Sequence, residues 1–336
     1  MAMKIDHYTD LGEFEYGSVD QVTPGVRRVI CKNPNPFTFR GTGTYIIGRG
    51  EVAVVDPGPA LDSHVDDVLA ALEPGERVTH ILVTHTHSDH STLVPRMKEM
   101  TGALSYGYGP HGEVRAYDPN DKVDFSAYIT AEEKQKYDKE WDDIPEELKR
   151  EGADVDFVPD VAVRDGDVID GGNWTVTAVH TPGHCSNHIC FAYNEEKALF
   201  SGDHVMGWAT SVVGPPDGSM KDYMDSLRKL LDRDDEVYWP THGPAIPEPR
   251  DYVAKFIAHR TEREDQIVGY LGDRPKKIAD FIPDMYAAYD KRLWYPAAGS
   301  AHAHMLHLYE TGKVTVVADE TNPEADPKLT ATYQLA

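Results

Sequence analysis

Residues 85–90 of this 336-residue chain read His-Thr-His-Ser-Asp-His, which places three histidines and an aspartate within one short segment. The segment follows directly on residues 79–84, a run rich in β-branched and apolar residues that is typical of a strand. A strand that ends in this way presents imidazole nitrogens and a carboxylate at one place, the ligand set that suits zinc and similar divalent ions. The segment therefore predicts a metal site at the end of a strand.

Three later segments repeat this design and supply further ligand types. The strand-like run 174–179 leads through a Pro-Gly turn to His184, residues 198–201 lead through a glycine to Asp203, and residues 237–240 lead to His242. Loops held at strand ends by a rigid sheet are where metal-binding and catalytic residues concentrate. We expect these side chains to complete the site begun by residues 85–90.

This ordered set of motifs resembles the metallo-β-lactamase-fold hydrolase superfamily. Residues 41–48 and 52–59 are similar to its opening strands, and residues 181–188, 201–208 and 259–267 are similar to signatures of the β-lactamase-like protein 2 family. The similarity covers most of the chain apart from one insertion. It implies an α/β fold, the four-layer αββα metallo-β-lactamase sandwich, followed by a smaller and mainly helical winged-helix-like C-terminal domain.

The expected domain organisation follows from this resemblance. Residues 1–258 would form the sandwich, with an insertion at 106–160, and residues 259–336 the C-terminal domain. Helical segments are expected over 63–72 and 222–231, from about His259, and over 278–289 and 301–309, with a strand at 312–317.

The resemblance also implies a dinuclear metal site. One metal would be held by His85, His87 and His184. The second would be held by Asp89, His90 and His242, with Asp203 bridging the two. Asp56 is expected to orient one of the ligands.

Two divalent ions would fill this site, with zinc favoured and iron or manganese as alternatives. A metal-bound hydroxide would attack the substrate, and Asp89, as the catalytic residue, would bind the second metal and orient that hydroxide. Trp208 and Thr210 are expected to contact the substrate. His188 has two interpretations, stabilisation of an oxyanion or substrate carboxylate and a purely structural hydrogen bond.

The insertion is strongly acidic, since residues 118–160 contain 15 Asp or Glu and 6 Lys or Arg. Its centre, 130–141, predicts an exposed helix that begins with Thr130 and Glu133 at capping-box spacing. The insertion is either a solvated surface segment or a lid over the site.

The net charge of −24 disfavours polyanionic partners, because nucleic-acid phosphates are bound chiefly by Lys and Arg. The C-terminal domain is itself acidic, and its one basic patch, 274–277, is short. Packing beside the active site is therefore favoured over DNA binding. In this domain His302, His304 and His307 either reach the pocket or face the core or the seam between domains.

The favoured function is hydrolysis of a small ester, thioester, lactone or amide. The alternatives are a metal-dependent endoribonuclease acting on single-stranded RNA, which rests on the resemblance alone, and a β-lactamase. The partner would be a small-molecule substrate rather than a membrane or nucleic acid, and an oligomer is possible. The chain has no long apolar run, its first ten residues lack a secretory pattern, and it has 3 cysteines, so we expect it to be cytoplasmic.

Overall fold

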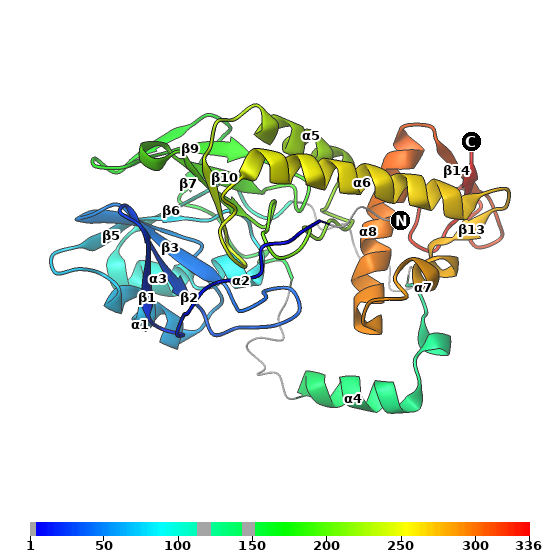
Figure 1. Cartoon of the computed structure of the whole chain (residues 1–336), viewed down its shortest axis with the longest axis horizontal. Coiled ribbons are helices and arrows are strands. Elements are labelled where there is room, and N and C mark those ends of the chain that lie inside the picture. Colours follow the sequence, from blue (N-terminus) through cyan, green and yellow to red (C-terminus); the bar gives the residue numbers. More distant parts are fainter. Residues whose placement is uncertain (1–4, 113–121, 143–151) are drawn as a thin grey trace.

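The computed structural model of the chain describes residues 5–112, 122–142 and 152–336. Its two main β-sheets face one another (Figure 1). The first sheet has seven strands in chain order. They are β1 (Val19–Thr23), β2 (Val26–Ile30), β3 (Gly43–Ile47), β4 (Glu51–Val55), β5 (Arg77–Leu82), β6 (Leu104–Gly107) and β7 (Val161–Ala162).

The second sheet has five strands. In spatial order they are β12 (Val237–Pro240), β11 (Ala198–Gly202), β10 (Ile189–Tyr193), β9 (Thr175–His180) and β8 (Val168–Asp170). Both sheets are mixed, because β4 pairs in parallel with β5, and β11 with β12, while the other pairs of the second sheet are antiparallel.

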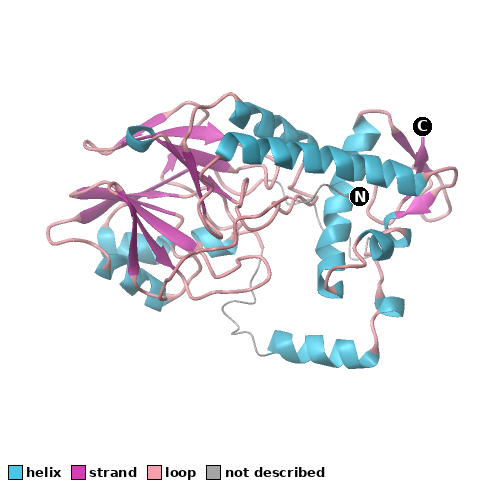
Figure 2. Cartoon of the chain, in the orientation of Figure 1, coloured by secondary structure: helices cyan, strands magenta, loops and turns pink. Residues whose placement is uncertain are grey.

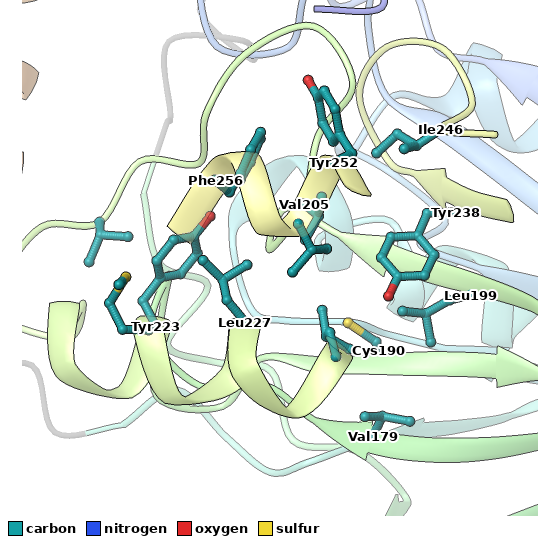
Figure 3. Packing of buried hydrophobic residues seen from close by; sticks show 14 of the residues in the cluster. Val179, Cys190, Leu199, Val205, Tyr223, Leu227, Tyr238, Ile246, Tyr252 and Phe256 are labelled. Carbon is teal, nitrogen blue, oxygen red and sulfur yellow. The ribbon is translucent and has the colours of Figure 1, made fainter. Parts of the chain in front are cut away.

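Helices cover the outer face of each sheet and complete four layers (Figure 2). On the first sheet, apolar residues of α1 (Asp62–Ala70) and α3 (Val94–Thr101) pack against β4 and β5. On the second, Tyr223 of α5 (Met220–Leu231) and Phe256 of α6 (Pro249–Leu271) join a buried cluster with Cys190 and Leu199 of the sheet (Figure 3). The αββα sandwich that the resemblance implied is confirmed.

The C-terminal region forms its own apolar cluster around helix α8 (Trp294–Glu310). A three-stranded sheet in the order β13 (Lys276–Lys277), β15 (Thr332–Leu335) and β14 (Val314–Val317) lies beside it. Three short helices lie between β13 and α8, namely η4 (Ile278–Asp280), α7 (Ile282–Met285) and η5 (Lys291–Leu293).

Several helix limits differ from those expected. The helix expected from about His259 begins at Pro249, a residue suited to a first helical turn, so the division after residue 258 falls inside α6. The continuous helix expected over 278–289 is wrong, because the chain forms η4 and α7, with a proline at the start of α7. Helix α8 begins at Trp294, earlier than the expected residue 301, since Pro296 lies in its first turn, where a proline is tolerated.

Residues 122–142 of the insertion pack against the C-terminal region, whereas its residues 152–160 lie against the first sheet and the loop that contains His87. Helix α4 (Ala131–Asp142) begins with the expected reciprocal bonds, in which Thr130 and Glu133 each donate a backbone N–H to the side chain of the other. Before it, Phe125 is fully buried, with its ring 5.7 Å from that of Trp294. The segment is therefore docked rather than free in solvent. Residues 113–121 and 143–151 of the insertion lie outside the described residues, and the lid remains a prediction.

Within the described residues, no helix has both the length and the apolar character needed to cross a bilayer.

Candidate metal centre

All the predicted metal ligands converge at one end of the two sheets. His85 follows β5, and His87 stands at the start of the short helix α2 (Ser88–Ser91), which carries Asp89 and His90. From the second sheet come three more, in loops that follow β9, β11 and β12. They are His184, Asp203 and His242.

The first three histidines form a close group. The Nδ1 atom of His87 lies 2.9 Å from Nε2 of His85 and 2.9 Å from Nε2 of His184. In the second group, Oδ2 of Asp89 lies 3.1 Å from Nε2 of His242 and 3.6 Å from Nε2 of His90. Each group is compact enough for one cation to contact all its members.

Asp203 lies between the two groups. Its Oδ2 is 3.6 Å from Nε2 of His90 and 3.9 Å from Nε2 of His184, and its Oδ1 is 3.5 Å from Nε2 of His242. One carboxylate therefore reaches donors of both groups. This placement agrees with the bridging role that the resemblance implied.

The ring orientations suit metal binding. Nδ1 of His90 donates to Asp56, Nδ1 of His184 to the Val212 carbonyl at 2.6 Å, and Nδ1 of His242 to the Gly41 carbonyl at 3.3 Å. Each bond leaves Nε2 directed at the centre as a lone-pair donor. Nε2 of His90 and Oδ1 of Asp203 are buried without a hydrogen-bond partner among the described residues, so the donor set fits a pair of divalent cations.

Electrostatics favour positive charge at this point. Burial lowers the pKa of His87 to about 3, and burial together with the neighbouring imidazoles holds the pKa of His85 well below its ordinary value. Burial alone would also lower the pKa of His90, but the carboxylates of Asp89, Asp203 and Asp56 outweigh it and raise that pKa. His85 and His87 are therefore neutral, the protonation state that binds metals, whereas the carboxylates around His90 favour positive charge at that position.

Asp56 supports the centre from behind, as predicted. Its Oδ1 accepts the Thr84 backbone N–H at 2.8 Å, and its Oδ2 accepts bonds from the Thr84 and Thr241 hydroxyls and from Nδ1 of His90 at 2.7–2.9 Å. It is fully buried and has a φ of 47°, a region in which Asp and Asn are more common than most residues. One carboxylate thus connects the loops after β4, β5 and β12.

His188 is placed differently from the substrate contact that was proposed. The side chain is fully buried; its Nε2 accepts the Asp203 backbone N–H at 3.2 Å, and its Nδ1 lies 2.9 Å from the Thr181 hydroxyl. Both ring nitrogens are therefore engaged by protein groups, and His188 is not among the residues that line the cavity. This placement favours the structural interpretation, in which His188 positions the Asp203 backbone.

A cavity of about 630 Å³ leads from the metal ligands to the C-terminal helices. Trp208 and Thr210 line it, as expected, and Trp208 stacks on Phe39 with ring centroids 5.2 Å apart. No sequence pattern indicated the opposite wall of the cavity. That wall includes Arg260 and Arg263 of α6, Tyr286, Tyr289, and Pro296 of α8.

His302, His304 and His307 are not among the residues that line this cavity. Nδ1 of His307 and of His304 lie 2.6 and 3.4 Å from Oε1 of Glu264, and His302 contacts the Pro327 carbonyl. Of the two interpretations, the structure supports the one in which they face the core and the seam between α6 and α8.

Known proteins are similar to this chain over nearly its whole length. Residues 38–242 match the metallo-beta-lactamase superfamily, and residues 278–321 match the beta-lactamase associated winged helix domain. The Beta-lactamase-like protein 2 homolog of Drosophila melanogaster is 30% identical over 307 residues, which cover 89% of this chain and 92% of that protein. The Atrochrysone carboxyl ACP thioesterase AgnL7 of Paecilomyces divaricatus is 31% identical over 250 residues, 74% of this chain and 65% of that protein.

The fold also occurs in solved structures. The crystal structure of a Beta-lactamase domain protein from Burkholderia ambifaria has a TM-score of 0.72 at 21% identity, covering 95% of this chain and 94% of that one. Together with the clustered His and Asp ligands, these matches show that the chain belongs to the metallo-beta-lactamase superfamily of hydrolases and carries a C-terminal beta-lactamase-associated winged helix.

Proposed function

We propose that the protein hydrolyses a small acyl substrate, a thioester first, with esters, lactones and amides as the related classes. The observation that carries the proposal is the position of Asp89 in the pocket wall, where its side chain is 24% exposed while the histidines around it are buried. Support for a thioester comes from relatives such as AgnL7, which is named a thioesterase.

Each residue of the metal centre would have a separate role in this reaction. Two divalent metals would supply an activated water and polarise the scissile carbonyl. We propose that these metals are zinc, with iron or manganese as alternatives. His85, His87 and His184 would hold one metal, and Asp89, His90 and His242 the other, with Asp203 between them. Asp89 would orient the attacking water from the pocket side, because it alone of the second group has an exposed carboxylate edge.

The pocket would hold the acyl substrate in an environment of low polarity. Trp208, Val212 and Phe37 line it beside the metal ligands. Apolar walls exclude bulk water and strengthen electrostatic interactions at the reacting carbonyl. No serine or cysteine nucleophile is needed for this reaction. Cys185, next to His184, is buried, and this burial holds the pKa of its thiol well above the ordinary value.

The test is metal analysis of the purified protein together with a hydrolysis screen over thioesters, esters, lactones and amides. In Asp89→Asn we expect at least about a 100-fold loss of kcat, since a group that positions or deprotonates the nucleophile contributes on that scale, with at least one metal retained. Asp62→Asn, at an exposed position in α1, is the matched control. Full activity of Asp89→Asn would refute its role, and a metal-loaded protein that cleaves none of these substrates would refute the function.

A reducing compartment, the cytoplasm, is proposed for this protein. Cys31, Cys185 and Cys190 are all free and buried. Cell fractionation with an antibody to the chain tests this, and recovery in an exported fraction would contradict it.

A further inference from the structure

Two arginines of α6 line the pocket without an acidic partner among the described residues. Arg260 is 5% exposed; its guanidinium donates to the Ser211 carbonyl and lies over the Tyr223 ring, while its Nε has no hydrogen-bond partner. Arg263 donates to the Gln266 side chain at 2.9 Å, and its guanidinium lies 5.0 Å from the centre of the Tyr286 ring. Residues three apart on a helix lie on the same face, so both approach the pocket together.

Arg260 differs in this respect from the other buried arginines of the described residues, Arg27 and Arg28, each of which pairs with a carboxylate. With a net charge of −24, carboxylates are plentiful, and other guanidinium groups use them, as in the buried pair of Arg27 with Glu76 at 2.6 Å. Burying a cation without an opposite charge is costly unless a ligand supplies that charge. Arg260 and Arg263 therefore stand out as cations kept available to the pocket.

The other described residues of the pocket wall do not neutralise the two arginines. Its carboxylates, Asp89 and Asp203, belong to the metal centre. His259 also lines the cavity; burial, followed by the charges of Arg260 and Arg263, lowers its pKa to about 3, so it is neutral at physiological pH. The groups that the two arginines contact are all uncharged, namely the Ser211 carbonyl, the Gln266 amide and the Tyr223 and Tyr286 rings.

We propose that Arg263, together with Arg260, binds an anionic group of the substrate, a carboxylate or a phosphate, at the α6 side of the pocket. The inference rests on the proposed hydrolytic function and names the substrate class within it: an acyl compound with an aromatic or apolar body and one negative charge away from the scissile bond. A guanidinium presents paired N–H donors that match such an oxyanion, and stacking on Tyr286 restricts its orientation. Tyr289 and Trp208 offer surfaces for the body of the substrate.

The test compares three aryl thioesters that are identical except for a neutral, a carboxylate or a phosphate substituent. In the metal-loaded wild type we expect one of the two anionic compounds to have a higher kcat/KM than the neutral one. Which of the two is preferred distinguishes a carboxylate site from a phosphate site. In Arg263→Met the anionic-to-neutral ratio of kcat/KM should fall at least 10-fold, mainly through KM, since a lost charged hydrogen bond commonly costs that much. Arg263→Lys should retain part of the preference.

Arg250→Met is the matched control, because Arg250 is exposed on the first turn of the same helix and does not line the cavity. It should leave the ratio unchanged. Hydrolysis with equal ratios in wild type and Arg263→Met would overturn the anion site and leave the proposed function standing.

A binding measurement keeps the inference testable if no thioester is hydrolysed. Calorimetry with 2-naphthoate, 2-naphthyl phosphate and neutral 2-naphthol should show an anion preference in wild type that falls in Arg263→Met. Because anions can also bind metals, only the difference between the variants is used. An anion affinity that is the same in both proteins would overturn the inference.

Discussion

At the scale of single residues, Asp56 shows how one carboxylate organises a metal centre that it does not enter. It receives bonds from the loops after β5 and β12 while lying itself after β4, so the two sheets meet at its oxygens. Its bond to Nδ1 of His90 determines which ring nitrogen faces the centre. Such partners of metal ligands influence affinity nearly as strongly as the ligands do.

The variant Asp56→Asn tests this role. Asparagine tolerates the positive φ of 47° at this position, so the backbone need not change. We expect metal affinity to fall roughly 10- to 100-fold, because the amide cannot accept all the bonds that the carboxylate accepts. Competition with a chromophoric chelator measures the affinity. Thr241→Val, which removes only one of those bonds, should have a smaller effect; equal affinities in Asp56→Asn and wild type would contradict the role.

The metal ligands could be predicted from sequence because each stands within a few residues of an apolar strand run. The sequence pattern that predicts the strand therefore also predicts where the ligand lies. The pocket arginines could not. Arg260 and Arg263 stand in a charged stretch, 260–265, that reads as an ordinary solvated helix face. Only the packing of α6 against the loop that contains Ser211 shows that this face is covered. Apart from their place in the signature 259–267, the arginines had one local signal, their spacing of three.

At the scale of elements, the seam between α6 and α8 contains a buried carboxylate hydrogen-bonded to two histidines. Glu264 of α6 accepts bonds from His304 and His307 of α8. Burial alone would raise the pKa of Glu264, but these two bonds outweigh it and lower the pKa from 4.5 to about 2. Burial lowers the pKa of His304 to about 4, so this ring is neutral at physiological pH and donates its Nδ1–H.

This seam should make stability depend on pH. Because the folded-state pKa of Glu264 lies below the ordinary value of 4.5, its stabilisation is complete above pH 4.5 and is lost as the pH falls toward 2. In Glu264→Gln we expect a loss of about 2 kcal/mol in unfolding free energy at pH 7 and a smaller loss at pH 3.5. Urea denaturation of metal-free protein at both pH values measures it.

Asp265→Asn, exposed on the same helix, is the control for that experiment. A difference between wild type and Glu264→Gln that is the same at pH 7 and pH 3.5 would show that the carboxylate charge does not stabilise the seam.

The docked insertion segment gives a second prediction at this scale. Phe125 is fully buried in the C-terminal apolar cluster, between the rings of Trp294 and Tyr295. Phe125→Ala should cost about 3 kcal/mol of docking free energy and speed protease cleavage within 122–142 by about 100-fold. Ser126→Ala, at an exposed position, should cleave at the wild-type rate. Wild-type cleavage in Phe125→Ala would show that the segment is not held by this contact.

The elements themselves were predictable to different degrees. Helix α5 and the start of α4 follow local signals, an amphipathic pattern and a capping box, and both appear close to the expected residues. The docking of Phe125 depends on contacts between segments far apart in sequence, which no local pattern encodes. The break in the helix after Ile278 did have a local signal, the proline in the first turn of α7.

At the scale of the whole molecule, the net charge of −24 should determine which anions can be bound. One negative group can be held by the two arginines and the metals, whereas a polyanion must also approach an acidic surface. We expect a Kd weaker than about 10⁻⁴ M for single-stranded RNA at physiological salt. Filter binding and a cleavage assay measure this. Micromolar RNA binding, with cleavage by the metal-loaded protein, would favour the endoribonuclease alternative instead.

Helix α6 has a consequence for how this enzyme could be altered. It runs from Pro249 to Leu271, roughly 34 Å at 1.5 Å per residue, with neither proline nor glycine between Arg250 and Val268 to act as a joint. This continuous helix runs from the sandwich to the C-terminal region and so connects the two (Figure 1). The reactive centre stands on strand ends and the far wall on α6 and α8, so new selectivity could be grafted onto those helices while the hydrolytic apparatus stays as it is.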